Sequence, residues 1–270
     1  DEKRKVSLVF NGEIYNYLDL RSQLEKLGHK FKTNGDTEVL LKSYIQWKED
    51  CFKKIEGMFA FSICDEEVKK IFLVRDQYGQ KPLYYKHSGQ ILKFGSELKL
   101  FLNDSDSKLN INNLNKYLYF GFVKHNSLID NVNQIPPGHF LKFEYKKNRI
   151  QINPFWKIPQ KIENAQLDKF EILKLLKDSL KKQIRSDVST GFLLSGGVDS
   201  SLLVALASEI SQTKINTYNV SYNEDFSKVE RKNAKLVSDK YNTNHIDLTI
   251  DKFDIKSFFE ILEKFDEPII

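Results

Sequence analysis

Apolar residues follow different spacings in the two halves of the chain. In the first half, most apolar residues form short runs of strand length, at 6–10, 58–64, 71–74, 83–86, 91–95 and 140–143. Two stretches have helical spacing instead: one runs through Leu20 and Leu24 and is ended by Gly28, and the other runs through Leu40 and Tyr44. We therefore expect a β-rich first half with a few helices.

The second half alternates regularly between strands and helices. A helical face through Leu173, Leu176 and Leu180 comes first. The strands that follow are expected at 191–194, 215–220 and 245–248, and the helices at 201–210, 229–240 and 255–265. Such alternation predicts a parallel sheet flanked by helices. Two prolines and weak periodicity predict a linker at 154–166, which gives domains at 1–153 and 167–270.

Composition indicates a globular protein and argues against two classes of partner. At 270 residues the chain is long enough for two cores. Its formal net charge of +5 comes with scattered lysines and no long basic block, which argues against nucleic acid as a partner. No apolar stretch approaches the roughly 18 residues of a membrane span. The two cysteines lack metal-ligand spacing, so we expect reduced thiols in a cytoplasmic protein.

The most specific motif is a glycine turn in the second half. An apolar run through Leu194 ends at Ser195, Gly196 and Gly197, and helical periodicity begins directly after them. Glycines let the backbone turn tightly, and the amide N–H groups of such a turn, with the positive end of the next helix, suit a phosphate. The turn has no lysine of the Walker type, so it is not the common P-loop. The plainer alternative is a glycine turn with a serine cap on a helix.

A second motif, Asn11-Gly12-Glu13, closes the first strand. Asn-Gly is a strong tight-turn signal, and one interpretation is a turn that presents polar groups to water. The other is an oxyanion site, in which the Asn11 amide and the Gly12 N–H converge on one oxygen. Glu13 and Asp36 could then hold the ammonium group of a substrate. The spacing alone leaves both alternatives open.

Eight motifs in one order carry a resemblance to a known family. They are Asn-Gly-Glu-Ile-Tyr-Asn at 11–16, Gly-Asp-Thr-Glu-Val at 35–39, Gly-Met-Phe-Ala-Phe at 57–61, Arg-Asp-Gln-Tyr-Gly-Gln-Lys-Pro-Leu-Tyr-Tyr at 75–85, Ser-Glu-Leu-Lys at 96–99, Pro-Pro-Gly-His at 136–139, Ser-Asp-Val at 186–188 and Leu-Ser-Gly-Gly-Val-Asp-Ser-Ser at 194–201. Over nearly its whole length, the chain resembles glutamine-hydrolysing asparagine synthetases of the bacterial type.

The resemblance implies a fold and a chemistry for each half. The first half would be the later part of an N-terminal-nucleophile glutaminase domain, an α+β sandwich of two sheets between helix layers (αββα). The second would be the start of an α/β ATP pyrophosphatase (PP-loop) synthetase domain with a parallel sheet. Glutamine hydrolysis in the first domain would supply ammonia through an internal channel to an aspartate that ATP has adenylated. Mg²⁺ would bridge the phosphates, since their charge must be neutralised for attack at phosphorus. Family members are often homodimers, although nothing in this sequence fixes an interface.

The resemblance also implies roles for residues that match the family's motifs. Asn11 and Gly12 match the oxyanion hole, whereas Glu13 and Asp36 match residues that bind the α-amino group of glutamine. The nucleotide-binding positions are Leu194, Ser195, Gly196, Gly197, Val198, Asp199, Ser200, Ser201 and Val220.

Neither cysteine matches the family's nucleophile, which is an N-terminal cysteine. Cys51 is expected at the opening of a helix and Cys64 at the end of a strand, where packing explains both. The chain opens without a methionine and stops where another element is expected, so we expect a fragment that lacks both ends. Such a fragment would have no glutaminase turnover and little or no synthetase turnover. Metal ligands would lie beyond Ile270.

Two further functions stay open. Related amidotransferases aminate other carboxylates or sugars, and β-lactam synthetases use the same two-domain plan for ring closure. The second of these is a non-catalytic glutaminase-like domain kept as a storage or regulatory fold. The intact Asn11, Gly12, Glu13 and Asp36 argue against that alternative, because packing alone does not require them.

Overall fold

The computed structural model of the protein describes residues 5–159, 168–185, 188–222, 225–250, 254–262 and 264–265. Ser186 and Asp187 of the seventh motif lie outside these described residues. The chain divides into two compact units, Asp1–Gln160 with Leu262–Ile270, and Lys161–Ile261.

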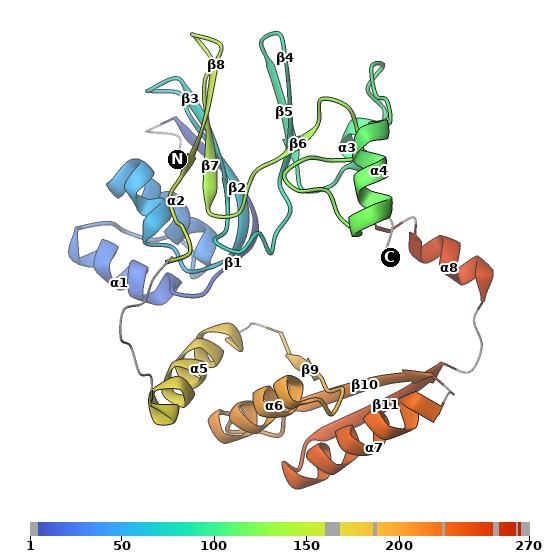
Figure 1. Cartoon of the computed structure of the whole chain (residues 1–270). Helices are drawn as coiled ribbons and strands as arrows, with labels where there is room; N and C mark the ends of the chain where they lie inside the picture. Colours follow the sequence, from blue (N-terminus) through green and yellow to red (C-terminus); the bar gives the residue numbers. More distant parts are fainter. Residues whose placement is uncertain are drawn as a thin grey trace. The chain divides into compact units, whose positions relative to one another are not determined.

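The first unit contains two antiparallel sheets (Figure 1). The larger has the order β1-β2-β3-β7-β8 and consists of β1 (Val6–Ile14), β2 (Gly57–Asp65), β3 (Lys70–Arg75), β7 (His139–Glu144) and β8 (Arg149–Pro154). The smaller has the order β5-β4-β6 and consists of β4 (Tyr84–Ser88), β5 (Ile91–Gly95) and β6 (Asn133–Gln134). Helices α1 (Tyr17–Lys26) and α2 (Asp36–Trp47) cover the larger sheet, and α3 (Lys99–Leu102) and α4 (Ile111–Phe120) lie beside the smaller one.

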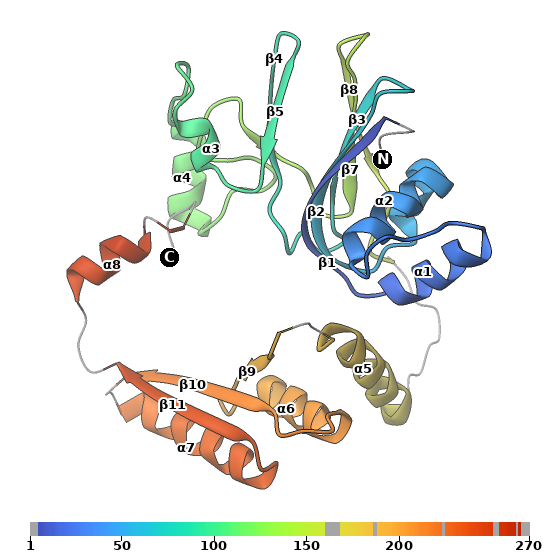
Figure 2. The ribbon, with the colours of Figure 1, turned by 180° about the vertical axis from the view of Figure 1, so that it is seen from behind.

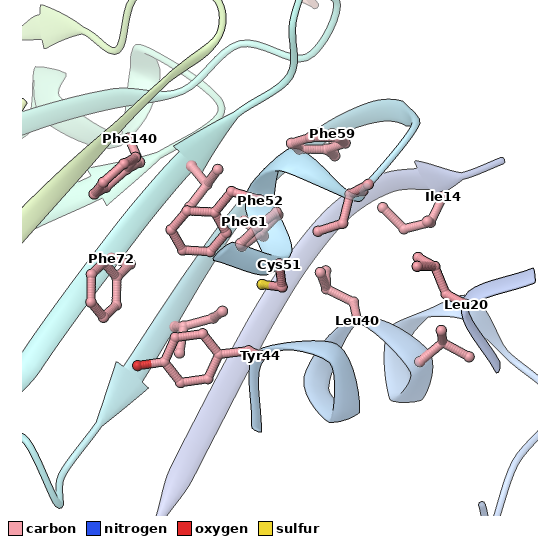
Figure 3. Packing of buried hydrophobic residues seen from close by; sticks show 14 of the residues in the cluster. Ile14, Leu20, Leu40, Tyr44, Cys51, Phe52, Phe59, Phe61, Phe72 and Phe140 are labelled. Carbon is pink, nitrogen blue, oxygen red and sulfur yellow. The ribbon is translucent and has the colours of Figure 1, made fainter. Parts of the chain in front are cut away.

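An aromatic core joins the helices to the larger sheet (Figure 3). Phe52, in the 3-10 helix η2 (Lys48–Lys53), lies at its centre and is fully buried. Its ring centroid is 5.1 Å from that of Phe140 and 5.9 Å from those of Phe61 and Phe72. Tilted aromatic pairs at such distances add about 0.5–1.5 kcal/mol each beyond the area they bury. Helices and sheet are therefore fixed to each other.

The other face of the larger sheet packs on the smaller sheet. Leu73 and Leu141 of the larger sheet are fully buried here, together with Ile135. Tyr85 and Phe94 contribute from the smaller sheet. The layers run helix, sheet, sheet, helix, as expected for the αββα sandwich (Figure 2).

Of the two interpretations of Asn11-Gly12, the tight turn is wrong. Residues 11–14 continue β1, which pairs with β2 up to Ile14↔Gly57. Gly12 has φ +144°, and a Cβ there would lie 2.0 Å from the carbonyl oxygen of Met58. This glycine allows close approach of two backbones within a sheet, which is the other use of glycine in a strand pattern. The chain turns only at Tyr15 and Asn16.

The second unit has a three-stranded parallel sheet of order β11-β10-β9. Its elements are α5 (Lys169–Gln183), β9 (Gly191–Leu193), α6 (Val198–Ile210), β10 (Asn216–Tyr222), α7 (Asp225–Lys240), β11 (Asn244–Ile250) and α8 (Ile255–Leu262). Leu180 of α5 packs on Leu206 of α6, and Leu194 packs between Val204 of α6 and Ala234 of α7. The expected alternation and the parallel pairing are thus confirmed. None of the helices described could cross a membrane.

The opposite face of this parallel sheet is apolar and exposed. Its side chains include Leu193, Val220 and Leu248, which are 78%, 51% and 51% exposed. Parallel sheets are ordinarily covered on both faces. Within the described residues, this one is covered only on the face that carries α6 and α7.

Candidate active sites

The first candidate site lies at the end of β1. Along this strand Val6 and Ile14 point toward the helices, whereas Asn11 and Glu13 are exposed on the other face. The alternation follows from the two-residue repeat of a strand. Two polar side chains of the first motif therefore share one face, with Gly12 between them.

The amide of Asn11 is held in place by a neighbouring element. Its Nδ2 donates a hydrogen bond of 3.0 Å to Oγ of Ser96, which follows β5. One donor of the expected oxyanion site is thereby oriented, although in this structure its partner is a hydroxyl of the protein. Sequence reasoning noted Ser96 only as part of a motif and gave it no role.

Asp36 is the first residue of α2 and lies beside the end of β1. Its Oδ2 accepts a 3.0 Å hydrogen bond from the backbone N–H of Ile14, the residue after Glu13. The structure thus brings Asp36, 22 residues away in sequence, next to the first motif. Burial raises the pKa of the neighbouring Tyr15, and the charges of Glu13 and Asp76 add to the effect. Both carboxylates lie near the end of β1, Glu13 on its exposed face and Asp36 at the backbone of Ile14, and a carboxylate suits a cationic group of a ligand.

A buried network fixes the strand that opposes this motif. Asp76 is fully buried, and its Oδ2 accepts from the N–H groups of Phe59 and Lys81. Phe59 is the β2 residue that pairs with Gly12. Arg75 donates to the carbonyl oxygens of Gly79, Lys81 and Ile135, which holds the loop after β3. The Arg-Asp motif is therefore structural support for the site.

The second candidate site is the turn between β9 and α6. Gly196 has φ +78°, and a Cβ there would lie 2.6 Å from the backbone nitrogen of Ala234 in α7. Gly197 is the N-cap of α6, with φ −71° and ψ 166°, where a Cβ would meet only Oγ of Ser195 among the described residues, at 3.4 Å. The first glycine is required by packing, whereas the second leaves its surroundings open.

Donor groups gather around this opening. The hydroxyls of Ser195 and Ser200 are 3.1 Å apart, and Ser195 and Val198 are exposed. No acceptor is found in the described part of the chain for the N–H groups of Val198, Asp199 and Ser200. Unpaired N–H groups at a helix start, with the helix dipole behind them, bind anions. This end of the helix lies at the carboxyl edge of a parallel sheet, where ligands of such folds bind.

Leu194 and Val220, the other two positions expected to bind the nucleotide, differ from each other. Leu194 is 1% exposed and packs in the core, so only its backbone can reach a ligand. Its N–H donates 2.7 Å to the carbonyl oxygen of Tyr218. Val220, two residues farther along β10, is half exposed on the apolar face. Ser201 lies in the first turn of α6 and donates its N–H to the carbonyl oxygen of Gly197 at 3.0 Å.

Comparison with known proteins identifies the first unit. Residues 1–156, more than half of the chain, match the family model described as a glutamine amidotransferase domain. The chain belongs to this amidotransferase family. Residues 171–270 match a second model, described as asparagine synthase. Together the two matches confirm the resemblance inferred from the motifs and the two-domain layout.

Curated relatives of this amidotransferase carry matching names. Asparagine synthetases (glutamine-hydrolyzing) 3, 1 and 2 of Bacillus subtilis (strain 168) are 34%, 37% and 30% identical to the chain. The alignments cover 81%, 83% and 91% of this chain, and 37%, 36% and 34% of the relatives. The chain thus spans about a third of the length of these relatives.

Neither cysteine of this amidotransferase chain is poised as a nucleophile. Burial raises the pKa of Cys51, and the carboxylate of Asp50 adds to the effect. Burial also raises the pKa of Cys64, with smaller contributions from Glu66 and Asp65. Cys51 lies in η2 and Cys64 near the end of β2, close to the expected positions. Reactive thiols have a lowered pKa, so both residues serve packing.

Proposed function

We propose that this chain is part of a glutamine-dependent asparagine synthetase. In the complete protein, the glutaminase domain to which the first unit would belong would hydrolyse glutamine, and the synthetase domain would use ATP to activate aspartate, which then reacts with the ammonia. The two family matches and the names of the relatives support this proposal. The observation on which it chiefly rests is the open, donor-lined turn at Gly197, because packing of the fold does not account for it.

In the first unit, glutamine would lie along the exposed face of β1. Asn11 and Gly12 would donate to the oxygen that becomes negative when the amide is attacked, which typically lowers the barrier by about 3–4 kcal/mol per donor. Asn11 would exchange its bond to Ser96 for this oxygen. Glu13 and Asp36 would bind the α-ammonium group, since both lie at the end of β1.

In the second unit, we propose a PP-loop that binds ATP. The β- and γ-phosphates would accept hydrogen bonds from the turn of Ser195, Gly196 and Gly197 and from the start of α6 at 198–201. Leu194 and Val220 would contact the nucleoside end. Asp199, exposed in the first turn of α6, would repel phosphates unless a cation lay between them. Mg²⁺ would fit there, since it binds one or two carboxylates together with phosphate oxygens and neutralises their charge.

The remaining parts of the proposal concern boundaries and partners. We place the glutaminase domain at 1–153, the linker at 154–166 and the synthetase domain at 167–270. The substrates would be glutamine, aspartate and ATP, with no nucleic acid or membrane as partner and with the cytoplasm as location. A homodimer fits the family but is not assigned to a surface. Product analysis with the complete protein, aspartate, ATP and glutamine distinguishes asparagine synthesis from amination of another carboxylate or a sugar.

The nucleotide site is tested by Gly197→Val in this chain. The added side chain fills the space where phosphate would approach the backbone, so we expect ATP affinity in a calorimetric titration to fall at least about 30-fold, roughly 2 kcal/mol. The matched control is Gly35→Val. Gly35 is also a helix N-cap, with φ −75° and ψ 157°, and a Cβ there has nothing within 4 Å. Unchanged ATP affinity in Gly197→Val, or an equal loss in Gly35→Val, would contradict the assignment.

A further inference from the structure

Asn219 is a buried polar residue next to the turn of the second unit, and the family resemblance gave it no role. It lies in β10, the central strand of the sheet between β9 and β11, and is 3% exposed. Its Nδ2 donates a 2.9 Å hydrogen bond to the carbonyl oxygen of Leu194, the residue directly before Ser195. The bond joins positions 25 residues apart in sequence.

This side-chain hydrogen bond takes the place of the next backbone hydrogen bond between β9 and β10. The last Cα pair between β9 and β10 is Leu193↔Tyr218, and the N–H of Leu194 still donates to Tyr218. Beyond that point the chain leaves the sheet toward the glycine turn. A buried carbonyl without a donor costs about 1–3 kcal/mol. The side chain of Asn219 supplies the donor that the strand no longer provides, so both the N–H and the C=O of Leu194, the residue before the turn, are hydrogen-bonded.

The side chain of Asn219 also carries a free-energy cost, that of an unpaired buried oxygen, which packing alone would not explain. Oδ1 of Asn219 is buried and has no hydrogen-bond partner among the residues that the structure describes. Asp247, which pairs with Asn219 across β10 and β11, also has one buried oxygen without a partner in this described part. An apolar side chain of similar size would avoid this cost. The amide orientation is nevertheless the one that pairs, because turning it would place oxygen against the Leu194 carbonyl.

The neighbours of Asn219 on the same face of β10 do not contact the turn. Thr217 is fully buried, and its hydroxyl bonds Thr243 at 2.7 Å and Nδ1 of His245 at 2.9 Å. Ser221 is directed to the carbonyl oxygen of Leu248. Asn219 is thus the residue of these three that couples the sheet to the turn.

We propose that Asn219 is a positioning residue for the phosphate-binding turn. By fixing the carbonyl of Leu194 it sets the direction in which the chain enters Ser195, and so aims the N–H groups of Gly197 and the start of α6. The identity of the ligand rests on the proposed function, whereas the coupling between Asn219 and the turn does not.

The test compares Asn219→Leu with Thr217→Val. Leucine keeps the volume and removes both the donor and the orphaned oxygen. The relief of that oxygen offsets part of the cost of leaving the Leu194 carbonyl without its donor, while the turn loses its anchor. Thr217→Val removes a buried hydroxyl from the same strand and face without touching the turn. We expect amide hydrogen exchange in the peptide covering 195–198 to rise about tenfold in Asn219→Leu and to stay unchanged in Thr217→Val. Asn219→Ala provides the same comparison if the leucine variant does not fold.

A second measurement links the anchor to the ligand. The ratio of AMP to ATP dissociation constants reports what the turn contributes to binding the terminal phosphates. We expect this ratio to fall about tenfold in Asn219→Leu, with AMP affinity nearly unchanged, and not to fall in Thr217→Val. Unchanged exchange at 195–198 in both Asn219 variants would overturn the positioning role. If the unmodified chain binds ATP no more tightly than AMP, the proposed nucleotide site fails, and the exchange comparison still decides the role of Asn219.

Discussion

Gly12 in the first unit and Gly197 in the second belong to the two candidate sites, yet their surroundings are opposite. A Cβ on Gly12 would lie 2.0 Å from a backbone oxygen of β2, whereas within the described part of the chain a Cβ on Gly197 would meet only a serine hydroxyl, at 3.4 Å. Gly12 also has a positive φ, which side chains rarely adopt, and Gly197 does not. The fold therefore requires the first glycine whether or not a ligand binds there. It does not require the second.

The difference decides how each site can be tested. Substitution at Gly12 disturbs the pairing of β1 and β2, so a loss of function there would say nothing about an oxyanion hole. Substitution at Gly197 leaves the described packing intact, so a loss of ligand binding there is informative. The first site is therefore better tested by substituting side chains than by substituting Gly12, because Asn11, Glu13 and Asp36 are held by few contacts.

The largest effect is expected for Gly12→Ala. The new methyl group cannot avoid the Met58 carbonyl without separating β1 from β2 in the middle of a nine-residue ladder. We expect a loss of at least about 4 kcal/mol, which for a unit of this size lowers its melting temperature by more than about 10 °C. Differential scanning calorimetry measures it. A shift within 2 °C would remove the contrast between the two glycines.

Gly196→Ala should have an intermediate effect and gives the comparison within the second unit. Alanine at a left-handed φ costs about 1–2 kcal/mol, and the contact with Ala234 requires α7 to shift. Gly197→Ala, one residue later, should cost less than about 1 kcal/mol, because its backbone is extended and its surroundings are open. Thermal denaturation of both variants followed by circular dichroism checks the order. Equal destabilisation would show that packing requires both glycines.

The second unit could be predicted from the sequence more completely than the first. Each strand of β9, β10 and β11 is followed by a helix with clear periodicity, and the parallel pairing follows from that alternation. In the first unit, the sequence also predicts α1, α2, β2, β3, β4, β5 and β7 close to their observed places. There the apolar runs are short, and local spacing was enough to find them.

What the sequence did not reveal depends on tertiary contacts. α4 and β8 were not expected: α4 exposes several of its apolar residues, and β8 carries a proline and alternates weakly. Asn-Gly by itself signals a tight turn, and the close approach of Met58, 46 positions away, which calls for glycine within a strand here, cannot be seen in local sequence. For the same reason the sequence assigns no role to Ser96 or Asn219, since each bonds a residue far away in sequence.

The smallest effect on stability is expected for Asp36→Asn, which sharpens the test of the first site. The asparagine oxygen can still accept from the Ile14 N–H, so the melting temperature should stay within about 2 °C. The negative charge is lost, and with it a charge-assisted hydrogen bond to the proposed ammonium group. We expect glutamine affinity, measured by calorimetry, to fall about tenfold, or 1.4 kcal/mol. Asp19→Asn, the same change in the first turn of α1, is the control and should leave affinity unchanged. Asp36→Asn leaves the β1–β2 pairing untouched. A loss of affinity in Asp36→Asn but not in Asp19→Asn would therefore assign the ligand to the end of β1. Gly12→Ala cannot give this assignment, because it disturbs the pairing itself. Equal affinity in both variants would leave Asp36 with a structural role alone.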